Sequence, residues 1–144
     1  MIEQDTIRLL RECDAGIKMG VSSIDDVLQY VKDDELKDYL EKSKIDHEII
    51  QDDLQKLLDE YHDEGKEPTV MAKSMSWIKT NVKLAVDESD DTIADLITDG
   101  CNMGVKSLTQ YQNQYKAADE KSKEIADRLI AIEEKLGNQM RKFL

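Results

Sequence analysis

Apolar residues recur along the chain at alternating steps of three and four, which is the spacing of a helix that buries one face. The first stripe comprises Ile7, Leu10, Ile17, Val21, Ile24, Leu28 and Val31. This stripe predicts a helix over residues 5–32, in which Asp14 takes one of the inward positions. Three acids follow at residues 33–35. Acids favour the start of a helix because they interact with its dipole, so a second helix is expected to begin there.

A second stripe has the same spacing and comprises Leu36, Leu40, Ser43, His47, Ile50, Leu54, Leu57 and Tyr61. It predicts a helix over residues 34–62, which ends ahead of Gly65 because glycine commonly terminates helices. The turn between the two helices is very short, so we expect them to pack as antiparallel neighbours.

A connecting helix is predicted over residues 70–86, after Pro68 and the N-cap residue Thr69. Such a helix is about 25 Å long, so it can carry the chain from one end of a bundle to the other. Its apolar side chains either pack on the outside of the bundle or dock a second copy, because Trp and Met are enriched at interfaces. The candidate interface residues are Met71, Met75, Trp77 and Ile78.

Two further helices are predicted over residues 91–116 and 119–143. Their inward residues are Ile93, Ile97, Cys101, Val105, Leu108, Tyr111 and Tyr115 in the first, and Ile125, Leu129, Ile132, Leu136, Met140 and Phe143 in the second. The pattern therefore predicts a single all-α domain over residues 1–144. Its architecture is a four-helix bundle of two antiparallel hairpins, joined by a long crossover that contains a short fifth helix.

The two predicted hairpins share a short sequence. Residues 16–24 align with residues 100–108, and the shared pattern is Gly-x-x-Met-Gly-Val-x-Ser. An internal duplication accounts for this match. A hairpin, a crossover and a second hairpin is also the arrangement of ferritin-like bundles.

Several local motifs carry a family resemblance. They are Cys13-Asp14-Ala15-Gly16, Gly65-x-Glu67-Pro68, Trp77 with Lys79 and Lys83, and Asp90-Asp91. With these motifs the whole chain resembles an uncharacterised bacterial branch of the ferritin-like superfamily, a domain of unknown function related to rubrerythrins. The resemblance implies a ferritin-like four-helix fold and implies little about activity.

A ferritin-like di-iron centre needs six inward ligands: a Glu from each of two helices and a Glu-x-x-His motif from each of the others. In residues 34–62 His47 lies on the inward face, but Lys44 stands where the motif needs Glu. In the last helix the repeat places Glu133 opposite Lys44 and Leu136 opposite His47. The second helix therefore keeps the histidine of the motif, and the last helix keeps its carboxylate.

The remaining two helices offer less. Counting along the first hairpin puts His47 level with Gly20, and the repeat puts Gly104 at the equivalent place. At most two of the six ligands, His47 and Glu133, remain, so a di-iron oxidase is not expected. The two residues are expected to form a buried His–Glu hydrogen bond; a remnant site for one divalent ion is the alternative.

The paired glycines suggest a packing role, because a glycine inside a helix costs about 1 kcal/mol relative to alanine. One hypothesis is that the two Met-Gly-Val turns meet near a pseudo-twofold axis. The methionines, Met19 and Met103, would then fill the space that the metals vacated. The alternative is that Gly20 and Gly104 lie on the exposed face by accident.

The formal net charge of −12 disfavours nucleic acid and anionic membranes as partners. The apolar runs are too short to span a membrane, and the start of the chain lacks the pattern of a signal peptide. These features predict a cytoplasmic protein. Cys13 and Cys101 are expected to be buried free thiols rather than a disulfide or redox pair, with thiol sensing as a minor option.

The sequence shows no Ser–His–Asp or Cys–His arrangement and no phosphate-binding glycine loop, so neither an enzyme nor a bound cofactor is expected. A surface cation site at His62 with Asp59, Asp63 and Glu64 is weighed against simple solvation of those acids. Asp14 is expected either to reach water at a bundle end or to pair with a base across an interface.

Two functions remain open. The preferred one is a metal-free structural or interaction module that self-associates as a homodimer. The alternative is a residual metal-binding ferritin-like protein with a weak redox or stress-related role. The biological role itself is not predicted by the sequence, because one bundle fold hosts many unrelated functions.

Overall fold

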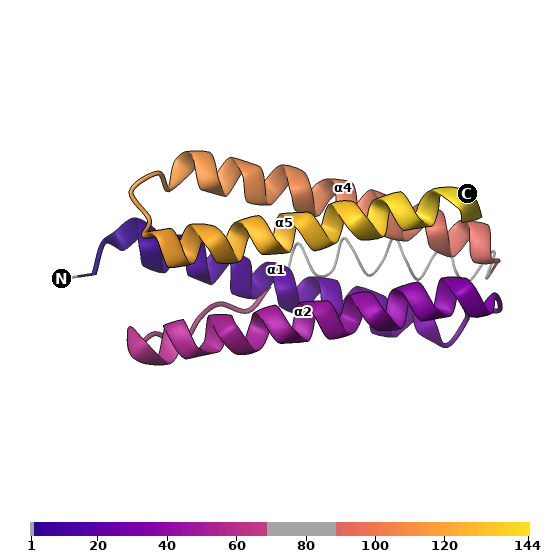
Figure 1. The fold of residues 1–144 in the computed structure, drawn as a ribbon, viewed down its shortest axis with the longest axis horizontal. Coiled ribbons are helices and arrows are strands. Elements are labelled where there is room, and N and C mark those ends of the chain that lie inside the picture. The colour runs from indigo at the N-terminus through magenta and orange to yellow at the C-terminus, as the bar shows by residue number, and fades with distance from the viewer. Residues whose placement is uncertain (1, 69–88) are drawn as a thin grey trace.

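The computed structural model describes residues 2–68 and 89–144. These residues form four long α-helices and a short 3₁₀ helix: α1 (Gln4–Leu28), α2 (Asp34–Glu60), α4 (Asp90–Gln114), α5 (Glu120–Met140) and η1 (Arg141–Phe143). The four long helices lie side by side as a bundle (Figure 1). The prediction of an all-α four-helix bundle is confirmed. The predicted connecting helix, with Met71, Met75, Trp77 and Ile78, lies outside the described residues.

Two antiparallel hairpins make up the bundle, α1 with α2 and α4 with α5 (Figure 1). α2 also packs against α5, and α1 contacts both α4 and α5. α2 ends at one end of the bundle and α4 begins at the other (Figure 1). None of the described helices is long and apolar enough to cross a membrane.

The first helix ends at Leu28, four residues before the predicted end. Residues 30–31 still pack on the core, but they do so from a turn. The carboxylate of Asp90, at the start of α4, accepts hydrogen bonds from the backbone N–H groups of Lys32 at 2.9 Å and Asp33 at 3.0 Å. The turn is therefore held by a residue far along the chain, which the local pattern of residues 5–32 does not reveal.

The apolar core consists of two clusters. The first includes Leu9, Leu10, Cys13, Ile17, Ile50, Leu54, Leu58, Leu108, Ile125 and Leu129. The second includes Ile24, Val27, Leu36, Leu40, Ile93, Ile97, Cys101, Leu136 and Met140. Between the two sets of residues, the inward face carries Gly20 on α1, Ser43 and His47 on α2, Gly104 on α4 and Glu133 on α5. This middle layer contains the candidate site.

Candidate functional site

The centre of the bundle holds a histidine and a glutamate in direct contact. Nε2 of His47, on α2, lies 2.6 Å from Oε1 of Glu133, on α5. His47 is completely buried and Glu133 is 9% exposed. The predicted buried His–Glu hydrogen bond is confirmed. Glu133 takes an inward position beside Ile132, which was predicted to face inward and is half-buried.

The second ring nitrogen fixes the protonation of the pair. Nδ1 of His47 lies 2.7 Å from the carbonyl oxygen of Ser43, one turn earlier on α2. A carbonyl oxygen only accepts hydrogen bonds, so Nδ1 must carry a hydrogen and donate it. Nε2 and Oε1 then need one further proton between them, because without it two lone pairs would face each other. The pair is either an imidazolium with a carboxylate or a neutral imidazole with a carboxylic acid.

The surroundings of His47 act on its pKa in opposite directions. Burial disfavours the charged ring and lowers the pKa of His47. The hydrogen bond to Glu133 and the negative charge of Glu133 favour the charged ring, as does the bond to the Ser43 carbonyl. These contributions outweigh burial and raise the pKa of His47 above its ordinary value of 6.5.

Two glycines make room for this pair. A Cβ atom on Gly20, in α1, would lie 2.9 Å from Nε2 of His47. A Cβ atom on Gly104, in α4, would lie 3.3 Å from Oε2 of Glu133. The levels counted from the sequence are therefore confirmed for both glycines. All four helices contribute to one layer, two with side chains and two with the space that those side chains occupy.

The hypothesis that methionines fill this layer is wrong. Met103 is 65% exposed, so it does not enter the core. The two glycines face the imidazole and the carboxylate, which fill the space themselves. The alternative of an accidental glycine pair on the exposed face is also wrong, because both positions contact the buried pair.

Cys101 extends the polar layer. Its thiol is buried and free, and it lies near enough to Glu133 to be affected by the charge of that side chain. Burial and the negative charge of Glu133 both raise the pKa of Cys101. Cys13 is also buried and free, and burial with the charges of Glu12 and Asp14 raises the pKa of Cys13 to about 12. The prediction of two buried free thiols is confirmed, and both remain protonated at neutral pH.

The positions that a di-iron site would use hold other groups. Lys44 forms an ion pair with Asp25 of α1 at 2.6 Å, on the side of α2 that faces α1. Leu136 is buried in the second apolar cluster. Within residues 2–68 and 89–144, no group of three or more His, Cys, Asp or Glu side chains is placed to hold a metal ion. The two predicted metal candidates, His47 and Glu133, bind each other.

Asp14 is paired with a lysine on its own helix. Its Oδ2 accepts a hydrogen bond from Nζ of Lys18 at 2.9 Å and one from the backbone N–H of Lys66 at 3.0 Å. Lys18 is four residues further along the same helix, so the expected partner across an interface or water at a bundle end is wrong. The ion pair could have been predicted from the sequence, because an acid and a lysine four residues apart lie on the same face of a helix.

The segment after α2 is tied back onto α1 by ion pairs. Lys66 contacts Glu12 at 2.5 Å, and Lys18 contacts Glu67 at 2.8 Å. Gly65 has a positive φ of 78°, and a Cβ atom there would lie 2.3 Å from Oδ2 of Asp14. Glycine is therefore required at this position both for its backbone and for its lack of a side chain.

The surface cation site considered at His62 is not assembled. Arg11 holds Asp63 through two hydrogen bonds of 2.6 Å and 3.0 Å. The hydrogen bond from Arg11 lowers the pKa of Asp63 in spite of partial burial. Asp63 thus belongs to the ion pairs that hold the segment against α1, while His62 is exposed.

No protein-family model, no curated protein and no solved structure matches the chain. The ferritin-like relationship implied by the local motifs therefore stays a prediction. What the structure itself establishes is a four-helix all-α bundle whose centre is a closed His–Glu pair between two glycines.

Proposed function

We propose that the chain is a non-enzymatic structural or interaction module. In this proposal it is a ferritin-like bundle in which a closed His–Glu pair takes the place of a metal centre. The observation that carries the proposal is the 2.6 Å contact between His47 and Glu133, by which the two inward donors satisfy each other.

The His47–Glu133 pair is not suited to binding a metal ion. A metal ion would have to displace the shared proton and break the short 2.6 Å hydrogen bond between the imidazole ring and the carboxyl group. Nδ1 of His47 is committed to the Ser43 carbonyl. The other two helices present Gly20 and Gly104, which supply no side-chain donor. A bridged metal pair would therefore lack most of its ligands.

Two features support the ferritin-like part of the proposal. The hairpins occur in the order expected for such bundles, and α2 ends at the opposite end of the bundle from the start of α4 (Figure 1). The polar pair also lies in the middle of the four helices, where di-iron carboxylate bundles hold their metals.

The alternative function is a residual metal-binding protein with a weak redox or stress-related role. It is favoured by the thiol of Cys101, a type of zinc ligand that lies near Glu133. The described residues do not, however, group this thiol with His47 and Glu133 in an arrangement that could hold a metal ion. The raised pKa of Cys101 opposes this reading, since a metal binds the thiolate.

Elemental analysis and thermal unfolding separate the two functions. We expect protein purified without chelator to carry far less than one metal ion per chain. Its melting temperature should be the same in Zn²⁺, Fe²⁺ or EDTA. Stoichiometric metal that raises the melting temperature, and that is lost in His47→Gln and in Cys101→Ser, would overturn the proposal in favour of the alternative.

A further inference from the structure

A second stripe with helical spacing runs along the outside of α2. It comprises Asp38, Lys42, Ile45, Ile49, Asp52 and Lys56, all of which are exposed. Each member follows a buried residue of α2 by two positions, which rotates it by about 200° to the side opposite His47. The steps of four and three are those of a helix that packs against another helix. We name these six residues the outer stripe.

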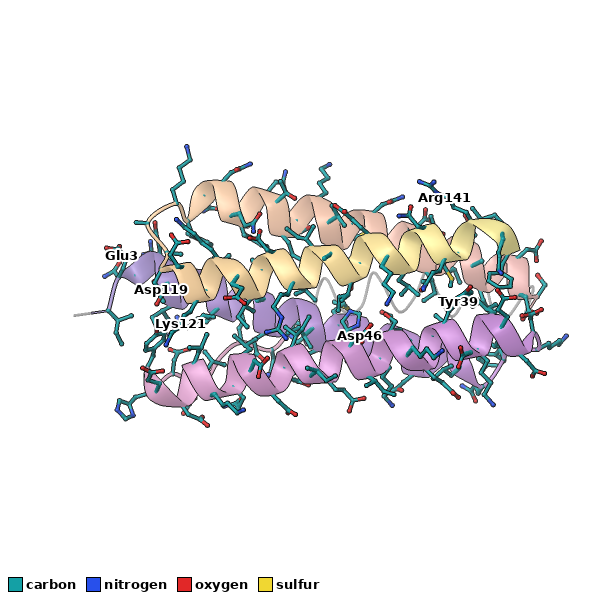
Figure 2. The ribbon with its side chains drawn as sticks, in the orientation of Figure 1. Glu3, Tyr39, Asp46, Asp119, Lys121 and Arg141 are labelled. Atoms are coloured by element: carbon teal, nitrogen blue, oxygen red, sulfur yellow. The ribbon has the colours of Figure 1, made fainter. Side chains whose placement is uncertain are left out.

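The middle of the outer stripe is apolar. Ile45 is 55% exposed and Ile49 is 51% exposed, and they stand one turn apart. Beside Ile49 the surface has a hollow of about 300 Å³, lined by Asp46, Ile49, Ile50, Arg128, Ala131 and Ile132. Figure 2 shows Asp46 in the space between α2 and α5. Two adjacent isoleucines beside an apolar hollow are suited to receive the side chains of another helix.

The order of residues in the outer stripe is self-complementary. It reads acid, base, Ile, Ile, acid, base. When a second copy of α2 lies antiparallel to the first, with the twofold axis level with residue 47, Ile45 faces Ile49 of the other copy. Lys42 then faces Asp52, and Asp38 faces Lys56. Twofold symmetry makes each contact occur twice, so the ends supply four ion pairs around four isoleucines.

The charge of the outer stripe also permits self-association. The chain carries a net charge of −12, but the stripe contains two acids and two bases and is neutral. Two of the acids beside it have bases near them: Lys135 lies 3.9 Å from Asp46, and Arg128 lies 2.8 Å from Asp53. A parallel arrangement of two copies would instead place like charges opposite each other, so the antiparallel order is selected.

We infer that the outer stripe of α2 is the interface of a twofold homodimer, formed by antiparallel packing of two α2 helices. The inference rests on the proposed function, since it names the partner of the interaction module as a second copy of the chain. It differs from the sequence prediction that residues 71–78 form the interface.

Charge reversal tests the inference. Sedimentation equilibrium over a concentration series would compare wild type, Lys42→Asp, Asp52→Lys and the double variant. Each single change places like charges opposite each other twice per dimer, and we expect the dissociation constant to rise at least about tenfold, the equivalent of about 1.4 kcal/mol. The double variant should return to within a few-fold of wild type. Residues 42 and 52 are about 15 Å apart along one helix, so this rescue can arise only between copies.

Two further variants complete the experiment. Ile45→Asp should abolish the dimer, whereas Lys37→Asp, an exposed change on the same helix outside the stripe, should leave it unchanged. Circular dichroism confirms that each variant is folded. A wild-type protein that is monomeric at the highest concentration, or single and double variants with the same dissociation constant, would overturn the inference. A dimer that forms through another surface would also overturn the inference, but it would not affect the proposed function. The elemental analysis described above tests the proposed function separately.

Discussion

Replacing Gly20 by alanine is expected to destabilise the bundle, although the same change inside a helix normally stabilises it. The normal gain is about 1 kcal/mol, because alanine restricts the unfolded chain and favours the helix. At Gly20 the new methyl group would lie 2.9 Å from Nε2 and 3.1 Å from Cδ2 of His47. These separations are too short for van der Waals contact, so either the ring or α1 has to move.

The ring of His47 has little freedom to move. It is completely buried, and its two nitrogens are held at 2.6 Å from Glu133 and 2.7 Å from the Ser43 carbonyl. Overpacking a core by one methyl group costs about 1–3 kcal/mol. Weakening a hydrogen bond to a charged group removes part of about 1.5–3 kcal/mol. After the helical gain is subtracted, Gly20→Ala should lower the free energy of unfolding by about 1–4 kcal/mol.

The repeat supplies matched controls for this substitution. A Cβ atom on Gly100 meets nothing within 4 Å, and one on Gly16 meets only Cδ2 of Leu129 at an ordinary 3.8 Å. Alanine at either position should stabilise the protein by up to about 1 kcal/mol. At Gly104 the contact with Oε2 of Glu133 is 3.3 Å, so the gain and the clash should nearly cancel.

Urea unfolding followed by circular dichroism would measure all four variants. The series should then be repeated in a His47→Ala background. Removing the ring frees the space beside α1, so Gly20→Ala should change sign and become stabilising there. Two results would contradict this expectation. In one, Gly20→Ala stabilises the wild-type protein as much as Gly100→Ala does. In the other, Gly20→Ala changes the free energy of unfolding equally in the wild-type and His47→Ala backgrounds.

Three further predictions concern the titratable groups. Because the pKa of His47 is raised in the folded state, its stabilisation is fully present below 6.5 and is lost as the pH rises through the folded value. Between neutral and alkaline pH, the free energy of unfolding should therefore decrease less in the His47→Gln variant than in the wild type. Equal decreases in the two proteins would contradict this. Asp14→Ala should cost roughly 1–3 kcal/mol and speed proteolysis after α2, since the Lys18 and backbone contacts are lost, and unchanged cleavage would contradict it. Cys13 and Cys101 should react with a thiol reagent slowly in the folded protein and rapidly in urea; rapid labelling without urea would contradict their burial.

The helices could be predicted well because each carries a local periodic signal. The apolar stripe of residues 34–62 places Leu36, Leu40 and Ile50 inward, as the structure does. The end of α1 could not be predicted in the same way. It depends on Asp90, whose carboxylate binds the turn from nearly 60 positions away. A long-range contact of this kind cannot be predicted from the spacing of apolar residues within α1.

The candidate site divides along similar lines. Counting helical turns predicts that His47, Glu133 and the two glycines lie at the same height in the bundle, and the structure confirms this. The role of Gly20 and Gly104 was misjudged, because a turn count gives the height of a residue but not which group occupies the space in front of it. The influence of Glu133 on the pKa of Cys101 was missed for the same reason.

The buried pair also selects the register of the two hairpins. The apolar clusters on either side of it are both made mainly of leucine and isoleucine, so hydrophobic packing alone specifies the position of α5 along α2 less strictly than the pair does. A shift of α5 along α2 by one turn moves Glu133 about 5.4 Å from His47 and leaves a buried polar group without its partner, at a cost of several kcal/mol. We expect the pair to contribute more to the choice of a single arrangement than to the total stability, since apolar residues of similar volume would pack the same space without a desolvation cost. A fixed register is what an interaction module requires, because it keeps the outer surface of α2 in one geometry.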